Sequence, residues 1–268
     1  MNAVPELRTV WDAVGAVEVR GRVNDRALAR DGASPHAVFV HGLGMATNYL
    51  EPTLRALGDE IAVSALDLPG FGGSRPVRGH LSLAALADAL IEWIRARQIG
   101  APILVGQSHG CQVVVEAVAR VPDIASALVL NAPTMLAEHR SIGAQLWRVL
   151  LDTPREPLSL VPHVARDDLR AGPLRILATL NDALRDRIED KLPNVRVPVT
   201  IANGARDPVS PPAWGERLAR LTGSRVGGSG AHLVVVPGAA HAVPFSHPHA
   251  LAAEIVAMAR RVGMRLDR

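Results

Sequence analysis

The sequence predicts an α/β fold, in which a mostly parallel sheet carries helices on both faces. Six short apolar runs end in turn residues and are typical of buried parallel strands: Ala37 to His41, Ile61 to Leu66, Pro102 to Gln107, Ala127 to Asn131, Val197 to Ala202 and His232 to Val236. Between or after them lie segments with an apolar residue at every third or fourth position, most clearly Leu83 to Arg95, Cys111 to Arg120 and Leu251 to Val262. Alternating strands and helices favour this fold class, because each crossover helix must pack its apolar stripe back onto the sheet.

The composition is that of one soluble globular unit, with 268 residues of which 48% are hydrophobic, 21% charged and 3% aromatic. Cys111 is the only cysteine, so it cannot form an internal disulfide, which fits a reducing compartment. The first eleven residues lack the basic and apolar runs of a signal peptide, and no apolar stretch reaches the roughly 18 residues that span a bilayer. We therefore expect a cytoplasmic protein without a membrane partner.

The charge pattern argues against a nucleic-acid partner. The formal net charge is +3, and the 29 basic residues include a single lysine, Lys191, which leaves 28 arginines spread along the chain. A nucleic-acid binder would more often gather its arginines on one face and interleave aromatic residues. The chain also lacks a P-loop, a G-x-G-x-x-G after the first strand, and His, Cys or Asp clusters at metal-ligand spacing. We expect a small-molecule substrate and neither a cofactor nor a metal, while the sequence leaves the oligomeric state open.

Two segments depart from the alternation of strands and helices. The first 25 residues, with alternating Val17, Val19 and Val23, predict an antiparallel hairpin at the edge of the sheet. Residues 134–194 contain no convincing strand, but helical patterns at Ala144 to Leu151 and Leu174 to Ile188 flank a proline-bearing stretch. Such a length is too great for an ordinary loop and predicts a helical lid over one end of the sheet. The core would then comprise residues 1–133 and 195–268. A glycine- and serine-rich stretch at 222–231 predicts a surface turn.

The strand from Pro102 to Gln107 runs through Gly106-Gln107-Ser108-His109-Gly110 directly into a helical pattern. This is the strand, turn and helix context that the G-x-S-x-G signature requires. Such a sharp turn holds the serine in a strained backbone conformation, and side chains at the two glycines would collide with the neighbouring strand and helix. We therefore predict that Ser108 is a nucleophile exposed at the carboxyl edge of the sheet.

A serine hydroxyl is a weak nucleophile and requires a base, which in turn requires an orienting carboxylate. Asp207 follows the strand from Val197 to Ala202, and His241 follows the last strand, so both are expected at the edge where ligands bind in parallel sheets. The alternative position for the acid, at the end of the strand from Ala127, carries Asn131 and no carboxylate. We predict the catalytic residues Ser108, Asp207 and His241.

Backbone N–H groups suit the stabilisation of a tetrahedral oxyanion because they are fixed in place. His41-Gly42-Leu43-Gly44 follows the first parallel strand, and its glycines let the chain turn close to the nucleophile. We expect the N–H groups of Leu43 and His109 to form the oxyanion hole. His41 is expected to brace this loop, the His109 imidazole to pack, and Cys111 to be a buried apolar residue. Gly42, Trp147 and Val209 are candidates for lining the substrate pocket.

Five ordered motifs together resemble the α/β-hydrolase superfamily, specifically its lid-bearing, single-domain bacterial members. They are His41 to Gly44, Asp67 to Ser74, Gly106 to Gly110, Gly204 to Val209 and Pro237 to His241. The order of serine, acid and histidine matches that group, and serine in place of aspartate at the elbow argues against haloalkane dehalogenases and epoxide hydrolases. The resemblance implies a serine hydrolase acting on a small, mostly apolar ester, lactone or related carbonyl compound. Carbon–carbon bond hydrolysis on the same residues, or ligand binding without turnover, are the alternatives.

Overall fold

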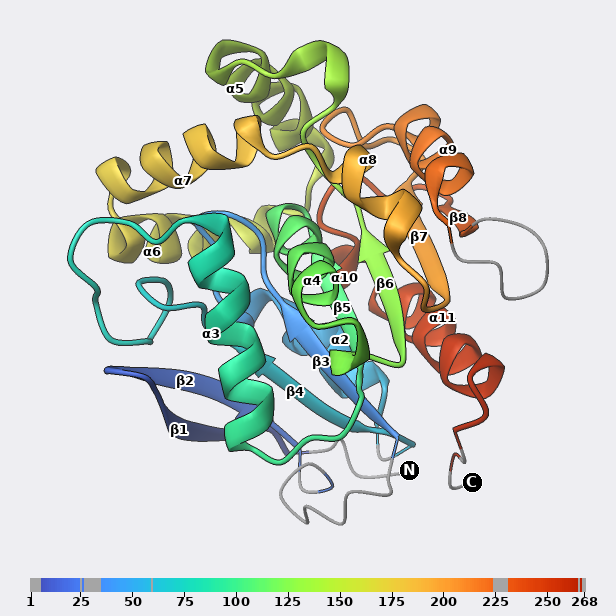
Figure 1. Cartoon of the computed structure of the whole chain (residues 1–268). Helices are drawn as coiled ribbons and strands as arrows, with labels where there is room; N and C mark the ends of the chain where they lie inside the picture. The colour runs from blue at the N-terminus through green and yellow to red at the C-terminus, as the bar shows by residue number, and fades with distance from the viewer. Residues whose placement is uncertain are drawn as a thin grey trace.

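A computed structural model describes residues 6–24, 26, 35–58, 60–223, 231–264 and 266, which form a three-layered α/β structure (Figure 1). The described residues form an eight-stranded sheet with the order β1-β2-β4-β3-β5-β6-β7-β8. Strands β3 to β8 run parallel to one another. Their bounds are His36–Val40 (β3), Ala62–Leu66 (β4), Ile103–Gln107 (β5), Ala127–Asn131 (β6), Val199–Gly204 (β7) and His232–Val236 (β8). The predicted α/β class is confirmed, and each predicted strand is present within two residues of its expected ends.

Helices cover both faces of the sheet because its central strands are apolar on both sides. One face of β3, including Val38 and Val40, packs under α3 (Leu83–Ala96) and α4 (His109–Arg120). The opposite face, including Ala37 and Phe39, packs under α2 (Glu51–Ala56), α10 (Val243–Ser246) and α11 (Pro248–Arg261). The sequence patterns predict α3, α4 and α11, whereas the short helix α2 and also α9 (Pro212–Leu221) were not predicted.

The predicted edge hairpin is also present. Strands β1 (Arg8–Val14) and β2 (Val17–Val23) are antiparallel, with Trp11 opposite Arg20, and β2 pairs antiparallel with β4. The hairpin therefore extends the parallel sheet at one edge. Of the surface turn predicted at 222–231, residues 224–230 lie outside the described part of the chain.

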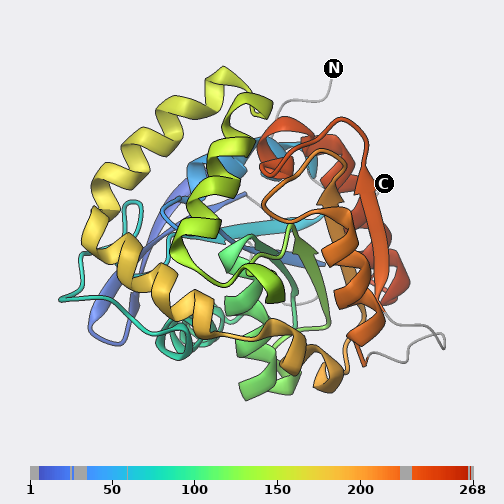
Figure 2. The same cartoon turned by 90° about the horizontal axis from the view of Figure 1, so that it is seen from above.

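Residues 134–194, which we call the lid segment, contain helices and no strand. The helices are α5 (Ile142–Asp152), α6 (Val161–Ala171), α7 (Pro173–Arg185) and α8 (Ile188–Lys191), and they lie over the carboxyl ends of the strands (Figures 1 and 2). The helical patterns predicted α5 and α7. Helix α6 was missed because Pro162 interrupts the pattern, although proline is well tolerated in the first turn, where it lies here. The division of the chain into a core and a separate lid domain stays a prediction.

None of the helices in the described ranges is both long enough and apolar enough to cross a membrane.

Candidate active site

Ser108 lies in the tight turn between β5 and α4, with a backbone φ of 55° and ψ of −121°. A side chain on Gly106 would place its Cβ 2.7 Å from the backbone of Cys111, and one on Gly110 would place it 2.3 Å from the carbonyl oxygen of Val40. Both contacts are far shorter than real Cβ contacts. The two glycines thus let strand, turn and helix pack closely enough to hold Ser108 in this strained conformation.

The structure brings the three predicted side chains together. His241 Nε2 lies 3.1 Å from Ser108 Oγ, and His241 Nδ1 lies 2.8 Å from Asp207 Oδ2. Asp207 is buried, and its Oδ1 already accepts from two backbone N–H groups. In the neutral form of His241, Nδ1–H donates to Asp207 Oδ2 and the lone pair of Nε2 faces the serine hydroxyl. The three residues follow β5, β7 and β8, whose carboxyl ends share one edge of the sheet.

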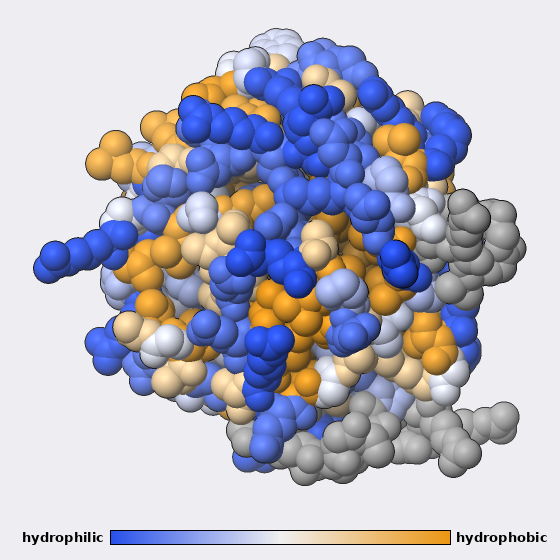
Figure 3. Space-filling model, in the orientation of Figure 1, coloured by the Kyte–Doolittle hydropathy of each residue, from blue (hydrophilic) through white to orange (hydrophobic). Residues whose placement is uncertain are grey.

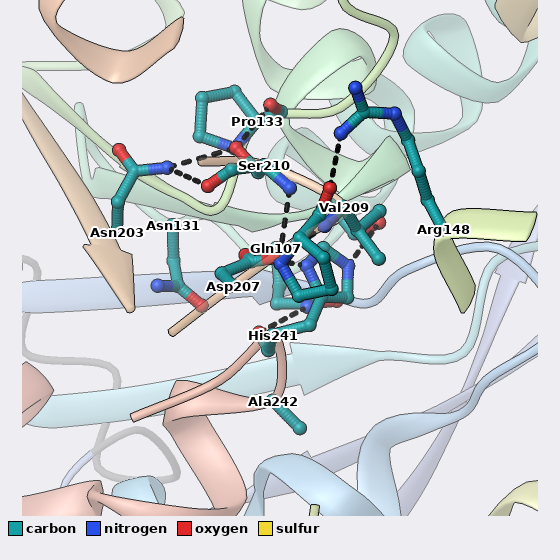
Figure 4. A network of polar contacts seen from close by, with 12 residues as sticks. Gln107, Asn131, Pro133, Arg148, Asn203, Asp207, Val209, Ser210, His241 and Ala242 are labelled. Atoms are coloured by element: carbon teal, nitrogen blue, oxygen red, sulfur yellow. Dashed lines mark hydrogen bonds and ion pairs between the residues drawn. The ribbon is translucent and has the colours of Figure 1, made fainter. Parts of the chain in front are cut away.

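The carboxylate of Asp207 is held by its own loop. Its Oδ1 accepts hydrogen bonds from the N–H groups of Val209, at 2.7 Å, and Ser210, at 2.8 Å. Ser210 is itself anchored, because its Oγ donates to the carbonyl of Pro133 at 2.7 Å and accepts from Asn203 Nδ2 at 2.9 Å (Figure 4). Asp207 Oδ2 is therefore the oxygen directed at His241. Val209, predicted as a pocket residue, contributes a backbone contact to this network.

Negative charges surround His241 on more than one side. Burial is the largest single influence and acts to lower the pKa of the imidazole, but Asp207 and the carboxylates of Asp152 and Glu156 together raise that pKa to about 9. The imidazolium form, which arises when His241 takes a proton, is thus favoured by its surroundings.

Asp152 and Glu156 belong to the lid segment, and the sequence analysis did not single them out. Glu156 Oε1 accepts a hydrogen bond of 2.6 Å from the N–H of Ala242, next to His241. Asp152 is 7% exposed, and its burial, together with the nearby charges of Glu156 and Asp207, raises its pKa to about 7. Asp152 Oδ1 and Glu156 Oε2 are buried without a hydrogen-bond partner among the described residues. The lid segment thus places two carboxyl groups against the histidine loop.

The loop after β3 lies beside the nucleophile. A Cβ on Gly42 would lie 3.2 Å from Ser108 Cβ, so Gly42 borders the serine directly. The N–H of Met45 donates to the carbonyl of Gly42 and closes the turn, whereas the N–H groups of Leu43 and His109 make no hydrogen bond within the described part of the chain. These two N–H groups are therefore available to a ligand.

His41 braces this loop as expected. Its Nδ1 donates to the carbonyl of Gly42 at 2.8 Å, and its Nε2 accepts from the N–H of Leu68 at 3.0 Å. Both contacts require the neutral imidazole, and burial lowers the pKa of His41 accordingly. Tyr49 adds a second brace, because its hydroxyl donates to Gln107 Oε1 at 2.6 Å and accepts from the N–H of Gly42 at 3.2 Å.

The remaining candidates lie in different environments. The His109 imidazole is 2% exposed and contacts Gln112 Oε1 through Nδ1 at 3.1 Å, while its Nε2 has no partner in the described structure. Cys111 is fully buried, and burial raises the pKa of its thiol, so it packs as the apolar residue that was expected. Trp147 is 60% exposed on α5 and is not brought to Ser108 by any contact, so its role in a pocket stays a prediction. Among the described residues no group of three or more His, Cys, Asp or Glu side chains is placed to hold a metal ion.

The fold and this constellation are those of a hydrolase built on an α/β sheet, and comparison with known proteins agrees. Residues 37–254 match the model of the alpha/beta hydrolase family, and the chain belongs to that family. It is therefore an α/β-hydrolase, and the similar members of this family include esterases.

Similar proteins add detail. The chain is 32% identical over 243 residues to the pimeloyl-[acyl-carrier protein] methyl ester esterase of Neisseria meningitidis serogroup B, covering 80% of this chain and 89% of that protein. It is 27% identical over 238 residues to the 2-(acetamidomethylene)succinate hydrolase of Mesorhizobium japonicum, covering 79% and 83%. A thermophilic esterase from Thermogutta terrifontis superposes with a TM-score of 0.76 at 23% identity, covering 95% of this chain and 99% of that chain, and shares its fold.

Proposed function

We propose that this protein is a serine hydrolase that cleaves a small, mostly apolar carboxylic ester or lactone through an acyl-enzyme on Ser108. The observation that carries the proposal is the continuous contact from Ser108 Oγ through His241 to the buried Asp207. The N–H groups of Leu43 and His109, which make no hydrogen bond among the described residues, supply the complementary donors in this proposal.

In the acylation step Ser108 Oγ attacks the substrate carbonyl carbon while its proton passes to His241 Nε2. The C=O π electrons move to the carbonyl oxygen, which becomes an oxyanion and accepts hydrogen bonds from the N–H groups of Leu43 and His109. Asp207 keeps His241 in the required tautomer and stabilises the imidazolium. The tetrahedral intermediate then collapses, the bond to the alkoxy oxygen breaks, and that oxygen takes the proton from His241 Nε2 as it leaves.

Deacylation repeats these steps with water as the nucleophile. His241 Nε2 takes a proton from water, whose oxygen attacks the acyl carbon, and the same N–H groups hold the second oxyanion. Collapse breaks the bond to Ser108 Oγ, which recovers its proton from His241. The products are a carboxylic acid and an alcohol from an ester, or a single hydroxy acid from a lactone, and the enzyme returns to its starting state.

The substrate class follows from the relatives and from the site together. A relative 32% identical over most of both chains is named as a methyl ester esterase, which supports an ester with a small alcohol as the first substrate to test. The carboxylates of Asp152 and Glu156 near His241 disfavour a leaving alcohol that carries its own negative charge, since like charges in a partly buried site repel.

Replacing the nucleophile tests the proposal directly. We expect Ser108→Ala to lower kcat for a 4-nitrophenyl ester by about 10⁴-fold or more, because the covalent route is lost and only binding and oxyanion stabilisation remain. The burst of nitrophenol expected of the parent should also be absent from this variant. The matched control is Ser159→Ala, at an exposed serine of the lid segment, which should leave kcat and the burst unchanged.

The same variant pair separates the alternatives. Labelling of folded parent protein by a fluorophosphonate, absent in Ser108→Ala, is the result expected of a nucleophilic serine. Failure of the parent to label or to turn over any ester would favour ligand binding without catalysis. Turnover of a vinylogous diketone in preference to short esters would favour carbon–carbon bond hydrolysis.

A further inference from the structure

A cavity of about 680 Å³ lies apart from the predicted catalytic residues. Its walls come from the β1–β2 hairpin, from the loop after β4 and from helices α6 and α7, which Figure 1 shows on the same side of the molecule. Neither Ser108, Asp207 and His241 nor Leu43 and His109 belong to its lining. The cavity is therefore separate from the proposed catalytic residues.

Four guanidinium groups line this cavity, and two of them are neutralised by carboxylates. Arg20 Nη1 lies 3.1 Å from Oδ2 of the buried Asp67, and Arg166 Nη2 lies 2.9 Å from Oδ1 of the buried Asp167. Asp67 is fully occupied, because it also accepts from the N–H groups of Thr47 and Gly73 at 2.7 Å each. These two arginines therefore form ion pairs with aspartates in the cavity wall.

The other two guanidinium groups, those of Arg170 and Arg175, have no carboxylate partner among the described residues. Arg175 donates from Nη2 to the carbonyl of Val77 at 2.8 Å, but its Nε and Nη1 are buried and make no hydrogen bond in the described structure. A partly buried guanidinium is stabilised when an anion pairs with it. The charge of Arg175 is not balanced by a carboxylate among the described residues, which favours an anionic ligand in the cavity.

Gly70 packs against the guanidinium group of Arg175. A Cβ at this position would lie 2.6 Å from Arg175 Nη1, so a side chain there would displace the guanidinium. The backbone φ of +85° also favours glycine. Asp168 on α6 lies against Gly44, where a Cβ would be 2.5 Å from Asp168 Oδ1, and no ion pair joins Asp168 to Arg170 or Arg175 in the described structure. The two positive charges are therefore not cancelled from within the cavity.

We propose that this cavity binds the phosphate group of an organic phosphate, held by Arg170 and Arg175, with the organic part against Trp11. Two unpaired guanidinium groups match the charge of a phosphate monoester dianion, and their planar forks suit phosphate oxygens. Trp11 lines the cavity and is 50% exposed, which leaves an aromatic face free for an apolar group. Because Arg170 and Arg175 belong to the lid segment and Trp11 to the core, the ligand would join the two.

The test measures binding alone and so is independent of the proposed hydrolase activity. The probe is phenyl phosphate, titrated calorimetrically into the whole protein and compared with inorganic phosphate, with phenol and with sodium chloride at matched ionic strength. Phenyl phosphate should bind most tightly and, at about a hundred times its Kd, raise the Tm by about 5 °C, while sodium chloride and phenol should not.

The variants locate the site. Arg170→Gln, at an exposed position, and Arg175→Gln should each weaken phenyl phosphate binding by about tenfold or more, which is the loss expected for a charge-assisted hydrogen bond. Arg185→Gln, at an exposed arginine on α7 outside the cavity, removes the same charge and should bind like the parent. Equal binding by the parent and Arg170→Gln, or an equal Tm shift with sodium chloride, would overturn the proposal. Equal affinity for inorganic and phenyl phosphate would overturn the role of Trp11.

Discussion

The core sheet and the lid segment treat their apolar side chains in opposite ways. The strands β3 to β7 are buried along nearly their whole length, and the largest fully buried side chain, Trp93, belongs to the core. The lid segment instead exposes ten large apolar side chains, and Figure 3 shows hydrophobic patches over the end formed by α5 and α7. They are Ile142, Leu146, Trp147, Val149, Leu150, Leu158, Val161, Leu169, Leu174 and Leu177. Apolar packing therefore fixes the core far more firmly than the outer face of the lid segment.

Polar contacts carry much of the junction between the two regions. Glu156 accepts from the N–H of Ala242, Arg148 donates to the carbonyl of Pro208, and Lys191 pairs with Glu116 Oε2 at 2.7 Å. Two of these contacts are next to residues of the proposed catalytic site. The core therefore sets the positions of the reacting groups, whereas the lid segment contributes charge around them.

The largest effect is expected from a change in the core site that leaves its shape intact. Asp207→Asn retains the contacts of Oδ1 with the N–H groups of Val209 and Ser210, but its amide would donate to His241 Nδ1 and force the wrong tautomer. We expect kcat to fall by about 10⁴-fold, the loss that this substitution causes in other Ser-His-Asp enzymes, with little change in Tm. Activity within tenfold of the parent would show that Asp207 does not orient the base.

Two tryptophans provide a matched test of the packing difference. Trp93 is fully buried on α3, and its Nε1 donates to Asp12 Oδ2 at 3.0 Å, whereas Trp147 on α5 is 60% exposed. Trp93→Ala should lower the free energy of unfolding by about 3 to 5 kcal/mol, because it opens a cavity. Trp147→Ala should change it by less than about 0.5 kcal/mol. Urea unfolding of both variants measures this difference, and comparable losses would mean that the outer face of α5 is packed after all.

The sequence predicts the core sheet and its elbow well, but it does not predict the contacts between the lid segment and the core. Buried runs such as Ala127 to Asn131 and the glycines around Ser108 predicted the sheet and the elbow, because burial and steric fit leave few alternatives there. The approach of Asp152 and Glu156 to His241 could not be predicted, since it depends on how α5 packs against a loop some 90 residues later in the chain. For the same reason nothing in the local sequence pairs Arg175 with Gly70.

The smallest effect is expected from the charge that the lid segment adds to the core site. Glu156→Gln removes a negative charge that raises the pKa of His241, so this pKa should fall. The midpoint of the acidic limb in the profile of kcat/KM against pH should therefore move to a lower pH. The parent limb should lie toward pH 9, because only the neutral imidazole can accept the serine proton. Glu254→Gln, on α11, removes the same charge from a residue that does not appear among the influences on His241 and serves as the control.

The shape of the profile distinguishes this electrostatic role from a merely structural one. Above the pKa of His241, the resting imidazole is neutral and the transition state carries an imidazolium, so removing the carboxylate lowers the plateau by about tenfold for each unit by which the pKa falls. Below that pKa both states carry the imidazolium, the contribution of Glu156 cancels, and the two profiles should coincide. A variant whose kcat/KM is reduced by the same factor at every pH would instead show that Glu156 only holds the lid segment in place.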